Sequence, residues 1–93
     1  MIRVEFKIQK GVFFMPHITI KMLKGRTEEQ KKAAAEKLAE ALTEVIGCNP
    51  THVSVSVEDF TPEEWQEQYR IEVTENQNLV LKPDYDPKDV LKK

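Results

Sequence analysis

The sequence has little cysteine and glycine, and it has no long apolar segment. Its 93 residues include one cysteine and three glycines. The single cysteine, Cys48, excludes an internal disulfide and a cysteine-based metal cluster. No apolar run approaches the roughly 18 residues that a membrane helix needs. The first residues also lack the unbroken apolar stretch of a signal peptide. These absences favour a small soluble domain in the cytoplasm.

The chain also lacks an excess of positive charge. Fourteen Lys and Arg face 16 Asp and Glu, for a formal net charge of −2. Nucleic acids and anionic membranes both need a concentrated basic surface, so neither is expected as a partner. A chain of this length forms one small domain with a thin core, and such domains often recruit a partner subunit.

The first half of the sequence predicts a strand, a helix and a second strand. Residues 16–23 alternate between apolar and polar, as in a half-buried strand. Thr27 and Gln30 have capping-box spacing, which opens a helix, and Gly47 supplies its left-handed end. Residues 53–57 form the second strand. Short connections make this a βαβ unit with parallel strands. The apolar face of the helix comprises Ala34, Leu38, Ala41, Leu42 and Val45.

A short second helix is expected next. Thr61 is its predicted cap, Pro62 its first residue and Glu64 the partner in a second capping box. The helix carries Trp65 and Tyr69. It completes a small α/β fold.

The remaining features point to an oligomer. Residues 79–81 look like a brief extended segment, and the tail from residue 82 is expected to be loosely ordered. A two-stranded sheet with one helix cannot close a core by itself. The open face carries Thr19, Ser54 and Ser56, which are small and suit packing against a second copy. The sheet is therefore expected to be completed by oligomerisation.

Met15-Pro16 reads like the beginning of a protein. If the mature chain begins at Pro16, its nitrogen is a secondary amine that can act as a base, whereas an internal proline has only an amide nitrogen. Residues 1–14 are rich in Phe, Ile and Lys and contain no Ala, Asp or Pro, a bias typical of translated non-coding DNA. They are interpreted as a mis-assigned leader or, because apolar and polar residues alternate there, as an extra strand. His17 points to the other face of the strand and is expected to be structural.

With these residues in view, the chain resembles the tautomerase superfamily, in its 4-oxalocrotonate tautomerase-like group. The resemblance rests on Met15-Pro16, the strands 17–23 and 53–57, the run 25–31 and Trp65. It implies a single βαβ domain over residues 15–93 that works through an amino-terminal proline. It also implies assembly as a homo-oligomer, with a dimer favoured by the longer carboxyl-terminal end.

The resemblance assigns roles to three residues. Pro16 falls at the catalytic proline, Arg26 at the arginine that binds the substrate carboxylate, and Trp65 at the aromatic wall of the pocket. Ser54 stands where the best-known members have a second arginine, which puts a dicarboxylate substrate in doubt. Arg70 is a candidate substitute for that arginine.

The sequence therefore predicts a tautomerase that interconverts the enol and keto forms of a small 2-keto acid. Pro16 is the acid and base after removal of Met15, and neither a cofactor nor a metal is needed. A related hydratase, dehalogenase or decarboxylase activity would use the same proline. The alternative from another class is a non-catalytic oligomeric binding protein built on the full-length chain.

Overall fold

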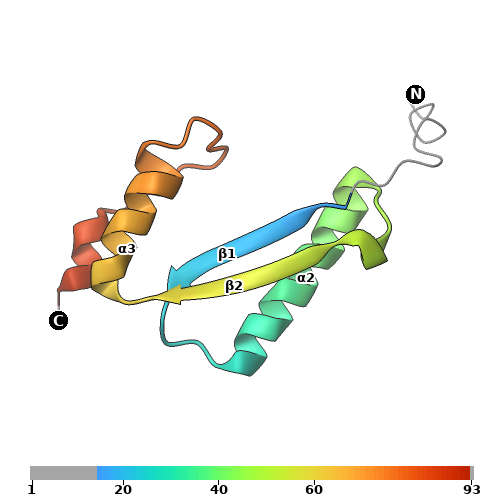
Figure 1. Ribbon diagram of the computed structural model, residues 1–93, viewed down its shortest axis with the longest axis horizontal. Coiled ribbons are helices and arrows are strands. Elements are labelled where there is room, and N and C mark those ends of the chain that lie inside the picture. Colours follow the sequence, from blue (N-terminus) through green and yellow to red (C-terminus); the bar gives the residue numbers. More distant parts are fainter. Residues whose placement is uncertain (1–14, 93) are drawn as a thin grey trace. The chain divides into compact units, whose positions relative to one another are not determined.

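A computed structural model describes residues 15–92 (Figure 1). The predicted leader or extra strand over residues 1–14 lies outside the described residues. The described chain forms two compact units: residues 15–19 with 27–56, and residues 20–26 with 57–92. The first is called the helix unit and the second the tail unit below. The single domain expected over residues 15–93 stays a prediction.

Two parallel strands form the sheet, as predicted. Strand β1 spans His17–Leu23 and β2 spans Ser54–Phe60. Near the beginning of both strands, the Ser54 N–H donates to the Pro16 carbonyl at 3.1 Å. Near the end of both, the Lys24 N–H donates to the Phe60 carbonyl at 2.9 Å. The strands thus run in the same direction (Figure 1), which confirms the βαβ unit. β2 continues past the predicted end at residue 57 because β1 offers pairing partners over its full length.

Helix α2 of the helix unit spans Glu28–Ile46 and has the predicted ends. The Gln30 N–H donates to Thr27 Oγ1 at 3.0 Å, and the Thr27 N–H donates to Gln30 Oε1 at 2.9 Å. These two bonds satisfy backbone donors that a helix leaves unpaired at its beginning. Gly47 ends the helix at φ 73°, where glycine avoids a Cβ clash. A 3₁₀ turn, η1, follows at Pro50–His52.

The helix unit buries little apolar surface. Cys48, which is 5% exposed, is the only buried hydrophobic residue within residues 15–92. On α2, Ala34 and Leu42 of the predicted apolar face are half-buried. Leu38 and Val45, on the same apolar face of the helix, are 43% and 81% exposed. The sheet is open, and one copy does not enclose a core.

Helix α3 of the tail unit spans Pro62–Tyr69, and both bonds of its predicted capping box are present. A π-helical turn, η2, continues over Arg70–Thr74. The expectation of a loosely ordered tail is wrong for η3, a 3₁₀ helix over Pro87–Leu91. Asp86 caps η3 by accepting from the Lys88 N–H at 3.0 Å. Residues 79–81 belong to neither helix nor strand. None of the helices within residues 15–92 is both long and apolar enough to traverse a bilayer.

Candidate functional site

Pro16 stands in the helix unit, directly before β1. It is half-buried, and its carbonyl accepts the hydrogen bond from the Ser54 N–H. Met15 before it is 65% exposed and has a φ of 47°. Residues other than glycine rarely adopt this conformation, and a following proline disfavours it further. While Met15 is attached, the Pro16 nitrogen is an amide without basicity, so proton transfer at Pro16 requires a free amino terminus.

His17 joins the two strands on an exposed face of the helix unit. Its Nδ1 lies 2.6 Å from Ser54 Oγ, and its Nε2 lies 3.2 Å from Ser56 Oγ. Ser56 in turn donates to Thr19 Oγ1 at 3.5 Å. The structural role expected for His17 agrees with these contacts. Ser54, at the position of the second arginine in the resembling enzymes, is thus engaged with an imidazole and supplies no positive charge.

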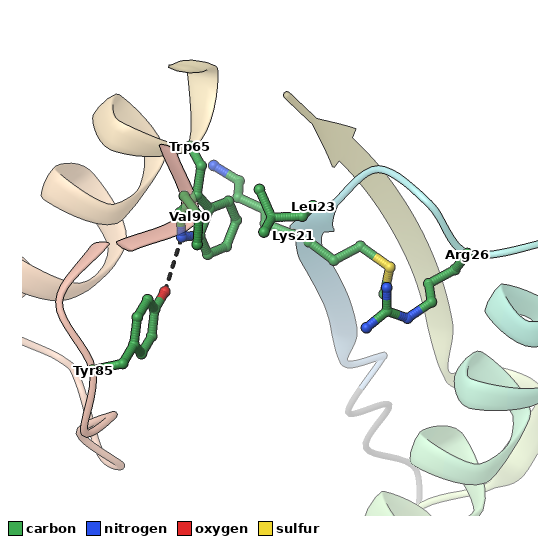
Figure 2. Close-up of a pocket in the computed structure, with 7 residues that line it drawn as sticks. Lys21, Leu23, Arg26, Trp65, Tyr85 and Val90 are labelled. Carbon is green, nitrogen blue, oxygen red and sulfur yellow. Dashed lines mark hydrogen bonds between the residues drawn. The ribbon is translucent and has the colours of Figure 1, made fainter. Parts of the chain in front are cut away.

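A cavity of about 300 Å³ lies within the tail unit. It brings together two of the three predicted site residues, Arg26 and Trp65 (Figure 2). Pro16 belongs to the helix unit. The other lining residues are Lys21, Met22, Leu23, Tyr85 and Val90.

Arg26 offers the cavity a positive charge that none of the other described residues pairs with. It follows Gly25, whose φ of 129° is a conformation that residues with a Cβ rarely adopt. Among residues 15–92, Arg26 makes no hydrogen bond or ion pair. An unpaired guanidinium can hold a carboxylate through two parallel hydrogen bonds. The geometry therefore suits the predicted role in carboxylate binding.

Trp65 is half-buried on α3 and forms part of the cavity wall. Its ring centroid lies 6.3 Å from that of Phe60, at the end of β2, with an interplanar angle of 51°. Its indole Nε1–H donates to Tyr85 Oη at 2.9 Å, the bond drawn in Figure 2. The indole is thereby held at both its apolar body and its polar edge.

Lys21 and Tyr85 are cavity residues that the sequence did not identify. Lys21 Nζ donates to Gln68 Oε1 at 2.6 Å and to Glu72 Oε2 at 2.7 Å. These partners are 47 and 51 residues away in sequence, so no local pattern indicates them. Tyr85 lies in the segment that was expected to be loosely ordered.

Arg70 does not resemble a free substrate-binding cation. Its guanidinium donates to Glu67 and, at 2.8 Å, to Glu75 Oε1. The hydrogen bond that Arg70 donates to Glu67, followed by the one that it donates to Glu75, raises the pKa of Arg70 above its usual value. The same contact with Arg70 lowers the pKa of Glu67. Arg70 is also absent from the residues that line the cavity. These contacts argue against Arg70 as the substitute for a second arginine.

Comparison with known proteins decides the family. The family described as "Tautomerase enzyme" matches residues 16–68. The chain belongs to the tautomerase family. It is accordingly an isomerase, as the resemblance predicted.

The matches to named tautomerases span most of the length of each relative. A probable tautomerase of Bacillus cereus is 49% identical over 47 residues, which are 50% of this chain and 77% of the relative. The 2-hydroxymuconate tautomerase of Comamonas testosteroni is 47% identical over 51 residues, covering 55% and 81%. A probable tautomerase of Xylella fastidiosa is 36% identical over 73 residues, covering 76% and 89%.

Solved structures of similar proteins agree with the βαβ unit. A 4-oxalocrotonate tautomerase isozyme from Methylibium petroleiphilum is 40% identical, with a TM-score of 0.52. The match covers 54% of this chain and 81% of that one. YwhB, described as a homologue of 4-oxalocrotonate tautomerase, is 39% identical with a TM-score of 0.51, covering 53% and 80%.

Proposed function

We propose that this tautomerase interconverts the enol and keto forms of a small 2-keto acid. In the proposal, the mature chain begins at Pro16 after removal of Met15, and the proline nitrogen is the acid and base. The observation that carries it is that the family match begins at Pro16. Arg26 supports it as well, because it lines the cavity and makes no hydrogen bond or ion pair with any residue among 15–92.

The proposed chemistry is one proton moved between two atoms of the substrate. The neutral amine of Pro16 takes the proton from the enol hydroxyl, and the carbonyl forms. The resulting ammonium returns a proton to the neighbouring carbon. Such transfer is most efficient when the pKa of the amine lies near the working pH. Desolvation and a nearby cation both lower the pKa of an amine, because both disfavour its charged form.

Arg26 and Trp65 have supporting roles in this proposal. The guanidinium of Arg26 holds the substrate carboxylate. Trp65 forms the apolar wall and excludes water, which strengthens the electrostatic interactions. Because Ser54 supplies no charge and Arg70 is already paired, the favoured substrate has a single carboxylate.

The proposed assembly is a homo-oligomer, with a dimer favoured. The open sheet supports it, as does the scarcity of buried residues within residues 15–92. The exposed apolar side chains of α2, above all Val45, would gain cover in such an assembly. Small molecules are the expected ligands, and the cytoplasm is the expected location.

The direct test compares two forms of the chain. Ketonisation of an arylenolpyruvate is followed by ultraviolet absorbance, with the chain that begins at Pro16 beside the full-length chain. Only the shorter form is expected to be active, and Pro16→Ala in that form is expected to abolish most of the activity. Equal turnover by both forms would contradict the proline mechanism.

A second measurement locates the mature terminus. Mass spectrometry of the protein expressed from its native gene gives the first residue directly, and Pro16 is expected. If residues 1–15 stay attached, the amide at Pro16 favours the alternative, a non-catalytic oligomeric binding protein. An active Pro16 chain that fails on enols but hydrates, dehalogenates or decarboxylates a small acid would point to the related activities.

A further inference from the structure

Tyr85 is held in the cavity wall by contacts of its own ring and by a contact of the chain two residues later. Its ring lies edge-on to that of Tyr69 on α3, with centroids 5.5 Å apart and an interplanar angle of 77°. Two residues later, the Pro87 carbonyl accepts from Gln66 Nε2, also on α3, at 2.8 Å. Together with the hydrogen bond from Trp65, these contacts fix the phenol at the cavity.

The hydrogen bond between Trp65 and Tyr85 leaves one proton unused. An indole N–H can only donate, so Tyr85 Oη is the acceptor of the 2.9 Å bond. The phenol keeps its own O–H. No described residue accepts that proton. Tyr85 is 41% exposed and lines the cavity, so its O–H is available to a ligand there.

The positive charge of Arg26 and the O–H donor of Tyr85 lie apart. Figure 2 shows Arg26 on one side of the cavity and Trp65, Val90 and Tyr85 together on the other. A ligand that pairs its carboxylate with Arg26 therefore presents its remote end to Trp65 and Tyr85. The indole suits a flat apolar group, and Val90 adds apolar surface beside it.

We infer that Tyr85 determines specificity by donating a hydrogen bond to the end of the ligand remote from the carboxylate. The ligand class is a small carboxylic acid with a flat apolar body and a hydrogen-bond acceptor at its far end. This inference deepens the proposed function, because it rests on the carboxylate role of Arg26. It needs neither a free Pro16 nor turnover.

Lys21 is the other polar donor in the same wall. Two of its three N–H groups serve Gln68 and Glu72, and Glu72 balances its charge. One N–H is left. The experiment must therefore separate Lys21 from Tyr85.

The test uses two ligands of nearly equal shape, para-methoxyphenylacetate and para-ethylphenylacetate. Only the first has an acceptor oxygen at its far end. Trp65 is the only tryptophan of the chain, so its indole N–H gives one signal in a heteronuclear magnetic resonance spectrum. Titration of the full-length chain, followed by this signal, yields a Kd for each ligand. The quantity of interest is the Kd of the ethyl ligand divided by that of the methoxy ligand.

Tyr85→Phe is expected to lower this ratio by about two- to tenfold, the worth of one net hydrogen bond. Tyr69→Phe is the matched control, because Tyr69 touches the Tyr85 ring but does not line the cavity. It is expected to leave the ratio unchanged, as is Lys21→Met. The inference is overturned if the Kd ratio is unchanged in Tyr85→Phe, or if it falls in Lys21→Met instead. It is also overturned if neither ligand binds.

A second measurement covers the case in which Tyr85→Phe does not fold. In the unaltered chain, a nuclear Overhauser contact is expected between the methoxy methyl group and the Tyr85 ring. A contact with the Arg26 side chain instead overturns the inference. Loss of turnover on Pro16→Ala tests the proposed function separately, because both ligands bind without reacting.

Discussion

The indole N–H of Trp65 donates a 2.9 Å hydrogen bond to the phenol oxygen of Tyr85, 20 residues later in the chain. The bond ties α3 to the segment that precedes η3. It also joins the aromatic wall that the sequence predicted to a residue that the sequence did not identify. Both side chains line the same cavity, so the contact that ties the tail unit together also lies at the proposed ligand site.

We expect Trp65 and Tyr85 to be energetically coupled. In a double-mutant cycle of Trp65→Phe and Tyr85→Phe, the coupling in the free energy of unfolding is expected to be about 1 kcal/mol, the net worth of a hydrogen bond. Denaturant unfolding of the four proteins measures it. Additive effects of the two substitutions would show that the bond does not stabilise the tail unit.

Arg26→Gln is expected to lower kcat/KM of the Pro16 chain by about a hundredfold, because the substrate carboxylate loses a charged bidentate partner. Arg26→Lys should restore only part of this loss, since an ammonium cannot make two parallel bonds. Arg70→Gln is the control, because Arg70 is paired with Glu67 and Glu75 and does not line the cavity. Equal losses from both arginines would refute the assignment of Arg26. Steady-state kinetics decides.

Gly25→Ala is expected to destabilise the chain by about 1–3 kcal/mol, because φ 129° strains a residue with a Cβ. No neighbour lies within 4 Å of the added methyl group, so the cost is in the backbone and not in a clash. The strain should displace Arg26 and weaken carboxylate binding. Gly47→Ala, also at positive φ but in the helix unit, should lower stability alone. Thermal unfolding and titration with para-methoxyphenylacetate separate the two effects.

The ion pair of Glu67 with Arg70 predicts a dependence of stability on pH. The hydrogen bond from Arg70 lowers the pKa of Glu67 below 4.5 in the folded chain. The pair therefore contributes to the free energy of unfolding at pH values above 4.5. This contribution is lost as the pH falls through the lowered pKa of Glu67. Glu67→Gln should reduce the melting temperature near neutral pH by a small amount, because the pair is exposed. The difference from the unaltered chain should vanish in strong acid. A difference that persists there would mean that Glu67 acts by packing.

The sequence predicted those features that depend on neighbours along the chain. Both capping boxes and the glycine end of α2 involve residues within four positions of one another, and their chemistry is local. Pairings across long separations could not be predicted in this way. The contact of Lys21 with Glu72 and that of Trp65 with Tyr85 depend on how distant segments meet. Arg26 and Trp65 were predicted from the resemblance to a family. The positions of functional residues in a family depend on its tertiary structure, which the pattern of one sequence does not reveal.

Cys48 is the one buried residue within residues 15–92, and this has a consequence for how the chain acquires stability. A lone copy leaves side chains such as Val45 in water, so folding and association are expected to be one bimolecular event. Dilution should then act as a denaturant, and the melting temperature should climb as the protein is concentrated. Calorimetry over a range of concentrations would reveal it, and a constant melting temperature would show that one copy suffices.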